Sequence, residues 1–81
     1  MISDNQIKAL QIIKDNPHIK GFDFAKLMWP DSKMHKQHWK KINAYGLSYL
    51  FKLAKRNWVI ENHWKFELTK EGLEKLKNKT F

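Results

Sequence analysis

The chain has 81 residues, enough for one domain with a small core, and its 42% hydrophobic and 14% aromatic residues exclude a wholly disordered chain. Sixteen Lys and Arg residues against eight acidic residues give a formal charge of +8, which favours a polyanionic partner, most simply nucleic acid, over a merely soluble basic protein. The chain lacks cysteine, an apolar run of about 18 residues and a basic leader, so we expect no disulfide, no membrane span, no secretory signal and a cytoplasmic location.

The first helix has clear start and stop signals. Ser3 and Gln6 form a capping-box pair, which predicts that the helix begins near Asp4. Because the residue before a proline avoids the helical region, the helix should end before Pro17. We expect this helix to support the core only.

A short strand and a second helix are expected next. Residues 18–20 can form a short extended segment, and Gly21 marks a turn. The second helix should run from residue 22 or 23 to residue 28 or 29. Its apolar residues, expected on the core face, are Phe24, Ala25, Leu27 and Met28.

The segment 32–43 is basic and contains no acidic residue. Two interpretations remain open, a basic loop or a backward extension of the next helix. Because Gly46 costs roughly 1 kcal/mol inside a helix, we favour the loop, with the helix starting near Asn43 or Ala44.

The helix expected over residues 44–56 has two different faces. One face is apolar and carries Leu47, Leu50, Phe51 and Ala54 at the i, i+3, i+4, i+7 spacing. At about 100° per residue, the opposite face carries Tyr45, Tyr49, Lys52 and Arg56. Charged side chains are rarely buried in a protein core, so this opposite face, with its two cations, is a candidate contact surface.

A hairpin and a last helix complete the chain. Asn57 is a plausible left-handed C-cap, and residues 58–61 and 64–68 alternate as half-buried strands around a two-residue loop at 62–63. Trp58 and Trp64 are expected in the core under this hairpin. Thr69 is a good N-cap for the last helix, whose Leu73 and Leu76 should pack inward.

Three sequence patterns, together with the spacing among them, resemble those of the winged helix-turn-helix regulators of the MarR-like and PadR-like group. They are Leu50-x-x-Leu53-x-x-x-Asn57-Trp58-Val59, Phe66-Glu67-Leu68-Thr69-x-x-Gly72 and Phe24-Ala25-x-x-Met28. The resemblance implies a mostly α, α+β fold: a winged helix-turn-helix with a short two-stranded wing and a C-terminal helix. It also implies duplex DNA binding, usually as a dimer, by a small transcriptional regulator whose helix 44–56 lies in the major groove.

Candidate DNA contacts follow from this interpretation. Arg56 can fork to guanine or phosphate and Lys52 can act as a point charge, whereas the alternative is an ordinary solvated helix face. Hydroxyl and amide groups that can reach phosphates or base edges are those of Asn43, Tyr45, Ser48 and Tyr49. Non-specific phosphate contacts are expected from Lys33, Lys36, Lys40 and Lys41.

Other functions have weaker support. His35 and His38 have a spacing that metals can use, but no Cys or carboxylate stands beside them, so we expect surface histidines and no cofactor. The chain has no Gly-rich phosphate loop and no nucleophile elbow, which argues against an enzyme. The serious alternative is a protein-interaction module that docks on an acidic partner. Double-stranded DNA is the expected partner, a homodimer is open, and no membrane is expected.

Overall fold

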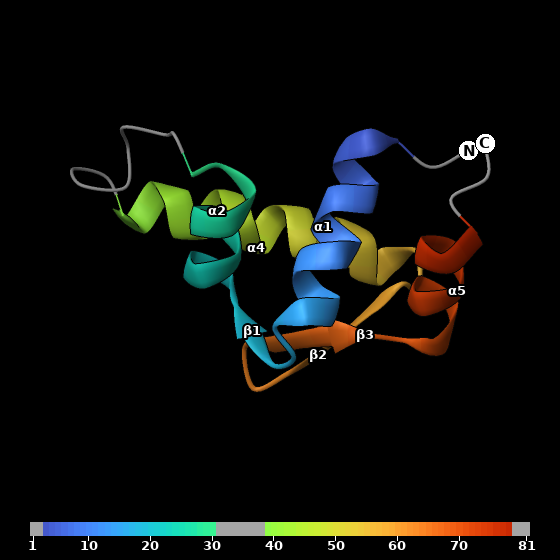
Figure 1. Cartoon of the computed structure of the whole chain (residues 1–81). Helices are drawn as coiled ribbons and strands as arrows, with labels where there is room; N and C mark the ends of the chain where they lie inside the picture. Colours follow the sequence, from blue (N-terminus) through green and yellow to red (C-terminus); the bar gives the residue numbers. More distant parts are fainter. Residues whose placement is uncertain (1–2, 31–38, 79–81) are drawn as a thin grey trace.

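The computed structural model describes residues 3–30 and 39–78, which form four helices and a three-stranded antiparallel sheet (Figure 1). In chain order the elements are α1 (Asp4–Asp15), β1 (Ile19–Lys20), α2 (Gly21–Met28), α4 (Trp39–Lys55), β2 (Val59–Asn62), β3 (Lys65–Leu68) and α5 (Lys70–Asn78). The sheet order is β1-β3-β2, with β3 in the centre. The prediction of a mostly helical α+β fold is confirmed.

The cap of α1 forms as predicted. The Gln6 backbone N–H donates to Ser3 Oγ at 3.2 Å, and the Ser3 N–H donates to Gln6 Oε1 at 2.9 Å. The helix ends at Asp15, before Asn16 and Pro17. Both ends of α1 therefore follow from local sequence signals.

Helix α2 starts at Gly21 itself, directly after β1. Phe24, Ala25 and Met28 are buried, but Leu27 is 45% exposed, so the prediction that Leu27 faces the core is wrong. At about 100° per residue the three buried positions centre on one side of the helix, and Leu27 lies about 110° away from it.

Helix α4 includes residues 39–43, so the preferred interpretation of that part as a loop is wrong. Gly46 lies inside the helix and is buried against α2. A Cβ at Gly46 would overlap the Gly21 carbonyl oxygen and come within 3.1 Å of the Ala25 Cβ. The missing side chain lets the two helices approach closely, and this packing offsets the propensity cost of about 1 kcal/mol.

The C-terminus of α4 is closed by a left-handed residue, as predicted. Asn57 has φ 64°, its N–H donates to the Ala54 carbonyl oxygen at 3.0 Å, and the Trp58 N–H donates to the Leu53 carbonyl oxygen at 3.2 Å. These two bonds form a Schellman motif, which satisfies carbonyls that the helix end would leave unpaired.

The hairpin register differs from the prediction by one residue. Asn62 pairs with Lys65, so the loop is His63-Trp64 and not residues 62–63. Trp58 belongs to the helix cap and the strand begins at Val59, which is buried while Ile60 is 53% exposed. Because side chains alternate along a strand, a shift of one residue exchanges the two faces.

The two hairpin tryptophans have different environments. Trp58 is buried as predicted, but Trp64 is 62% exposed, so its assignment to the core is wrong. The N-cap of α5 is confirmed, because the Gly72 N–H donates to Thr69 Oγ1 at 3.1 Å and Thr69 Oγ1 donates to the Asn57 carbonyl oxygen. Leu76 is buried and Leu73 is half-buried on the inner side of α5.

The core lies between the helices and the inner face of the sheet. Its largest fully buried side chains come from α1, α2, α4 and β3 and are Leu10, Ile13, Phe24, Leu50, Leu53 and Phe66. In Figure 1, α4 runs across the molecule behind α1 and α2, with the hairpin next to it. The core thus fixes which side of α4 faces solvent.

Candidate nucleic-acid interface

The buried side of α4 is defined by Ile42, Gly46, Leu50 and Leu53. These positions follow the i, i+4, i+8, i+11 spacing of one helical face. The observed buried face is therefore rotated about the helix axis relative to the predicted apolar face. Of the predicted residues, Leu47 and Ala54 are only half-buried, and Phe51 is 38% exposed.

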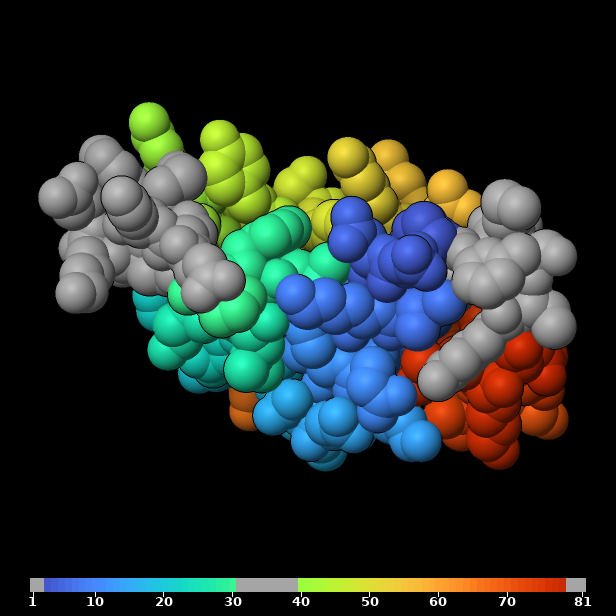
Figure 2. All heavy atoms as spheres, turned by 45° about the horizontal axis from the view of Figure 1, so that its top comes forward, coloured from blue at the N-terminus to red at the C-terminus, as the bar shows by residue number. Residues whose placement is uncertain are grey.

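The opposite side of α4 is a continuous exposed surface, which we call the α4 outer face. It lies within about 100° of arc on the helix and consists of Lys41, Ala44, Tyr45, Ser48, Lys52 and Lys55. Tyr45 is 57% exposed. Figure 2 shows the α4 atoms, in yellow-green to yellow, along the edge of the molecule behind α1 and α2. Cations, a phenol and a hydroxyl thus share one accessible surface.

The charge of α4 is of one sign. Its 17 residues contain four lysines and no acidic residue. Across residues 32–60 the sequence holds none of the eight acids but seven of the cations: Lys33, Lys36, Lys40, Lys41, Lys52, Lys55 and Arg56. The acids of the described residues lie on α1, α2, the hairpin and α5. The excess positive charge is therefore concentrated in the part of the sequence that contains α4.

Four of the predicted DNA contacts lie together on the α4 outer face: Lys41, Tyr45, Ser48 and Lys52. Lys40 is exposed but projects from another side of the first turn of α4. Lys33 and Lys36 lie outside the described residues. Sequence reasoning missed Lys55, although continuing the helical spacing from Lys41 and Lys52 identifies it.

Arg56 follows the last residue of α4 and is exposed. Its guanidinium lies over the Trp58 ring, with the central carbon 5.3 Å from the ring centroid. This cation–π contact holds the Arg56 charge at the C-terminal end of α4, next to Lys52 and Lys55 in the sequence. The predicted site residue therefore lies at the edge of the α4 outer face.

Tyr49 was predicted on the outer side of the helix and is instead half-buried on the core side. Its ring stacks on Phe24 with centroids 5.9 Å apart and meets Trp29 edge-on at 6.1 Å. Burial raises the pKa of the Tyr49 hydroxyl above its usual value, and the charge of Arg56 partly opposes this. The ring pattern shows that the aromatic faces of α2 and α4 complement one another, which the α4 sequence alone does not reveal.

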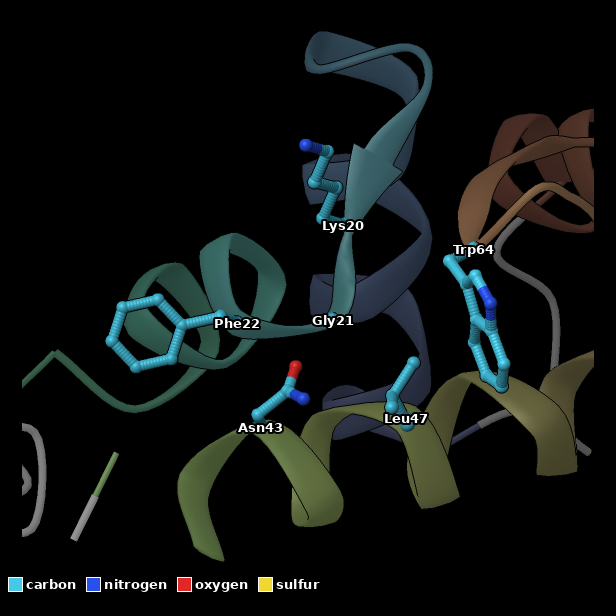
Figure 3. A pocket seen from close by; sticks show the side chains of 6 residues that line it. All are labelled: Lys20, Gly21, Phe22, Asn43, Leu47 and Trp64. Atoms are coloured by element: carbon cyan, nitrogen blue, oxygen red, sulfur yellow. The ribbon is translucent and has the colours of Figure 1, made fainter. Parts of the chain in front are cut away.

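Asn43 is half-buried and lies at the junction of α4 with the start of α2. It lines a cleft of about 320 Å³ together with Lys20, Gly21, Phe22, Leu47 and Trp64. Figure 3 shows the Asn43 amide and the Leu47 side chain pointing toward Gly21, while Trp64 extends from the hairpin toward α4. Asn43 thus belongs to this cleft and not to the α4 outer face.

The described residues offer neither a metal cluster nor a membrane-spanning helix. No group of three or more His, Cys, Asp or Glu side chains there is arranged to hold a metal ion, and His35 and His38 lie outside that part of the chain. None of the helices within residues 3–30 and 39–78 combines the length and apolarity needed to cross a membrane. No family model, curated protein or solved structure matches the chain.

Proposed function

We propose that the protein is a winged-helix domain that binds duplex DNA, with α4 as the recognition helix in the major groove. The observation that carries this proposal is the α4 outer face, an exposed surface with cations and hydroxyls on an acid-free helix. From Lys41 to Lys55 this face extends about 21 Å, at 1.5 Å per residue. The B-DNA major groove is about 12 Å wide and admits one α-helix.

The arrangement of elements supports the winged-helix assignment. Helix α2 packs on α4, and the two-stranded hairpin follows α4 directly. The sheet order β1-β3-β2 places the short first strand against the second strand of the hairpin. In a helix-turn-helix, such a pair of helices leaves the second helix free to enter the groove.

The charges along α4 support phosphate binding on both sides of a groove. Lys41 lies in the first turn, where the helix dipole adds to its positive potential, and Lys52 and Lys55 lie in the last turns. Arg56 adds a third cation at the C-terminal end. Between these ends, Tyr45 and Ser48 are the groups placed to reach base edges or sugar-phosphate atoms.

The test is fluorescence anisotropy of a labelled duplex of about 20 base pairs, titrated over a range of salt concentrations. Four phosphate contacts, from Lys41, Lys52, Lys55 and Arg56, predict a slope of log affinity against log salt of about −3.6, or about 150-fold weaker binding between 50 and 200 mM salt. In the variant Lys52→Ala/Lys55→Ala the slope should fall to about −1.8.

A matched control is available on α5. Lys75→Ala/Lys77→Ala removes the same charge from an exposed part of another helix and should leave most of the affinity and the slope unchanged. Equal losses of DNA affinity in the two double variants would refute a specific role for α4, because only the total charge of the protein would then matter. Absence of salt-dependent binding by the folded protein would refute duplex binding and favour docking on an acidic protein partner. Where binding is found, selection from a random duplex pool tests for the sequence-specific, regulatory form of the proposal.

A further inference from the structure

Trp64 occupies an unfavourable position in the hairpin. It is the second residue of the two-residue loop, with φ 65°, after His63 with φ 53°. Loops with two positive φ values favour Gly, which has no Cβ to clash, and Asn, whose short polar side chain tolerates the left-handed region. The Trp64 ring meets Phe51 at 6.3 Å and 83°, and 62% of the residue remains exposed. The described fold therefore gains little from a tryptophan at this position.

The Trp64 ring forms one wall of the cleft shown in Figure 3. Leu47 adds an apolar side chain from α4, and the Asn43 amide adds a donor and an acceptor. Gly21 is buried beneath them, and a Cβ there would come within 2.7 Å of Leu47 Cγ. An exposed aromatic ring next to an apolar floor and one amide suits a flat heterocycle with polar edges.

The sheet beside this cleft carries two lysines that face each other. Lys20 and Lys65 are directly opposite partners in β1 and β3, and both are exposed. Like charges at directly opposite positions destabilise a sheet. Within the described residues neither lysine forms an ion pair. An anion between them would relieve this repulsion.

We propose that the cleft binds an unpaired nucleobase, stacked on Trp64, while Lys20 and Lys65 hold the phosphates of the same strand. The inference rests on the proposed function: the duplex lies along α4, and one strand continues unpaired past the hairpin tip into the cleft. Base stacking on aromatic side chains tolerates any base, and amide groups read base edges. The preferred ligand is therefore a duplex with a single-stranded overhang.

The experiment compares two labelled probes by fluorescence anisotropy at fixed salt: a blunt duplex and the same duplex with about six unpaired thymines. The overhang should tighten binding by at least about fivefold, the effect of one stacked base. Trp64→Ala should abolish this gain while leaving blunt-duplex affinity unchanged, and Trp64→Phe should retain most of it. Ile60→Ala, at an exposed apolar residue of β2, is the matched control and should keep the gain.

The outcomes separate this inference from the proposed function. Equal affinity of the wild-type protein for both probes would overturn the cleft proposal and leave duplex binding by α4 standing. A gain that persists in Trp64→Ala would also overturn it. The third outcome is that the overhang probe binds and the blunt duplex does not. If this binding is lost in Trp64→Ala and unchanged in Lys52→Ala/Lys55→Ala, the cleft proposal is supported and duplex recognition by α4 is refuted. Circular dichroism of each variant establishes that it is folded.

Discussion

Replacing Gly46 by alanine tests whether the close approach of α2 and α4 holds the fold together. On helix propensity alone, Gly46→Ala should stabilise the protein by about 1 kcal/mol. The added Cβ would instead overlap the carbonyl oxygen of Gly21 and come within 3.1 Å of the Ala25 Cβ. A backbone carbonyl cannot rotate away as the end of a long side chain can, so α2 must move away from α4.

The magnitude follows from what that movement would disturb. Phe24 on α2 and Leu50 on α4 are fully buried in the same core, and separating their helices loosens both. Overpacking of this kind costs up to about 3 kcal/mol. After subtracting the propensity gain of about 1 kcal/mol, we expect a net loss of about 2 kcal/mol. For a domain of this size the loss lowers Tm by roughly 8–16 °C.

Thermal and denaturant unfolding followed by circular dichroism measure this change. Ser48→Ala is the control, because it raises helix propensity on the exposed side of the same helix and should raise Tm slightly. A Tm for Gly46→Ala equal to or above that of the wild-type protein would refute the reasoning. The glycine would then be a tolerated helix defect and not a requirement of the crossing.

Substitutions at three further positions test local features of the fold. Thr69→Ala removes the acceptor for the Gly72 N–H and should cost about 1 kcal/mol in denaturant unfolding, while Thr69→Ser keeps the cap and most of the stability. His63→Asn replaces a residue at φ 53° by one that adopts this conformation readily and should add roughly 1 kcal/mol; a lower Tm would contradict the turn assignment. Burial raises the pKa of Tyr49 in the folded state, so its contribution to stability is fully present below the unfolded pKa of about 10 and is lost as pH rises through the folded pKa. Stability should therefore fall more steeply above about pH 10 in the wild-type protein than in Tyr49→Phe, and parallel stability–pH curves would exclude the effect.

Both ends of α1, the end of α4 and the start of α5 were predictable because their signals are local. The Ser3 and Gln6 capping box, the left-handed Asn57 and the Thr69 N-cap each depend on residues within a few positions of one another. Hydrogen bonds over such short separations depend mainly on the local sequence. The alternation of helices and short strands, and hence the α+β class, follows from the same signals.

The orientation of α4 was only partly predictable because it depends on α2. Tyr49 is drawn to the core side by Phe24 and Trp29, and Phe51 turns outward toward the hairpin. Gly46, which argued locally against a helix, lies where the two helices touch. Both errors concern contacts between elements distant in sequence, which helical periodicity does not encode.

The same dependence affected the candidate site. Tyr45 and Lys52 were identified from the helical spacing, and Ser48 from its hydroxyl group. Lys41 was identified only as a lysine of the basic segment that was expected to be a loop. Asn43 differs because the start of α2 covers its side of the helix. In the hairpin, the Schellman motif takes Trp58 out of the strand, and the pairing of Asn62 with Lys65 leaves His63 and Trp64 as the loop.

Gly46 and Trp64 both violate local preferences, but only one violation is compensated inside the described fold. The cost of a glycine within α4 is offset by contact with Gly21 and Ala25, so packing explains it. Trp64 has a positive φ, an edge-on contact with Phe51 and 62% exposure, and this does not balance a bulky residue in a loop that favours glycine. Residues that break local rules without structural compensation are typical of functional sites. This contrast is why we assign the cleft beside Trp64, and not the helix crossing at Gly46, to ligand binding.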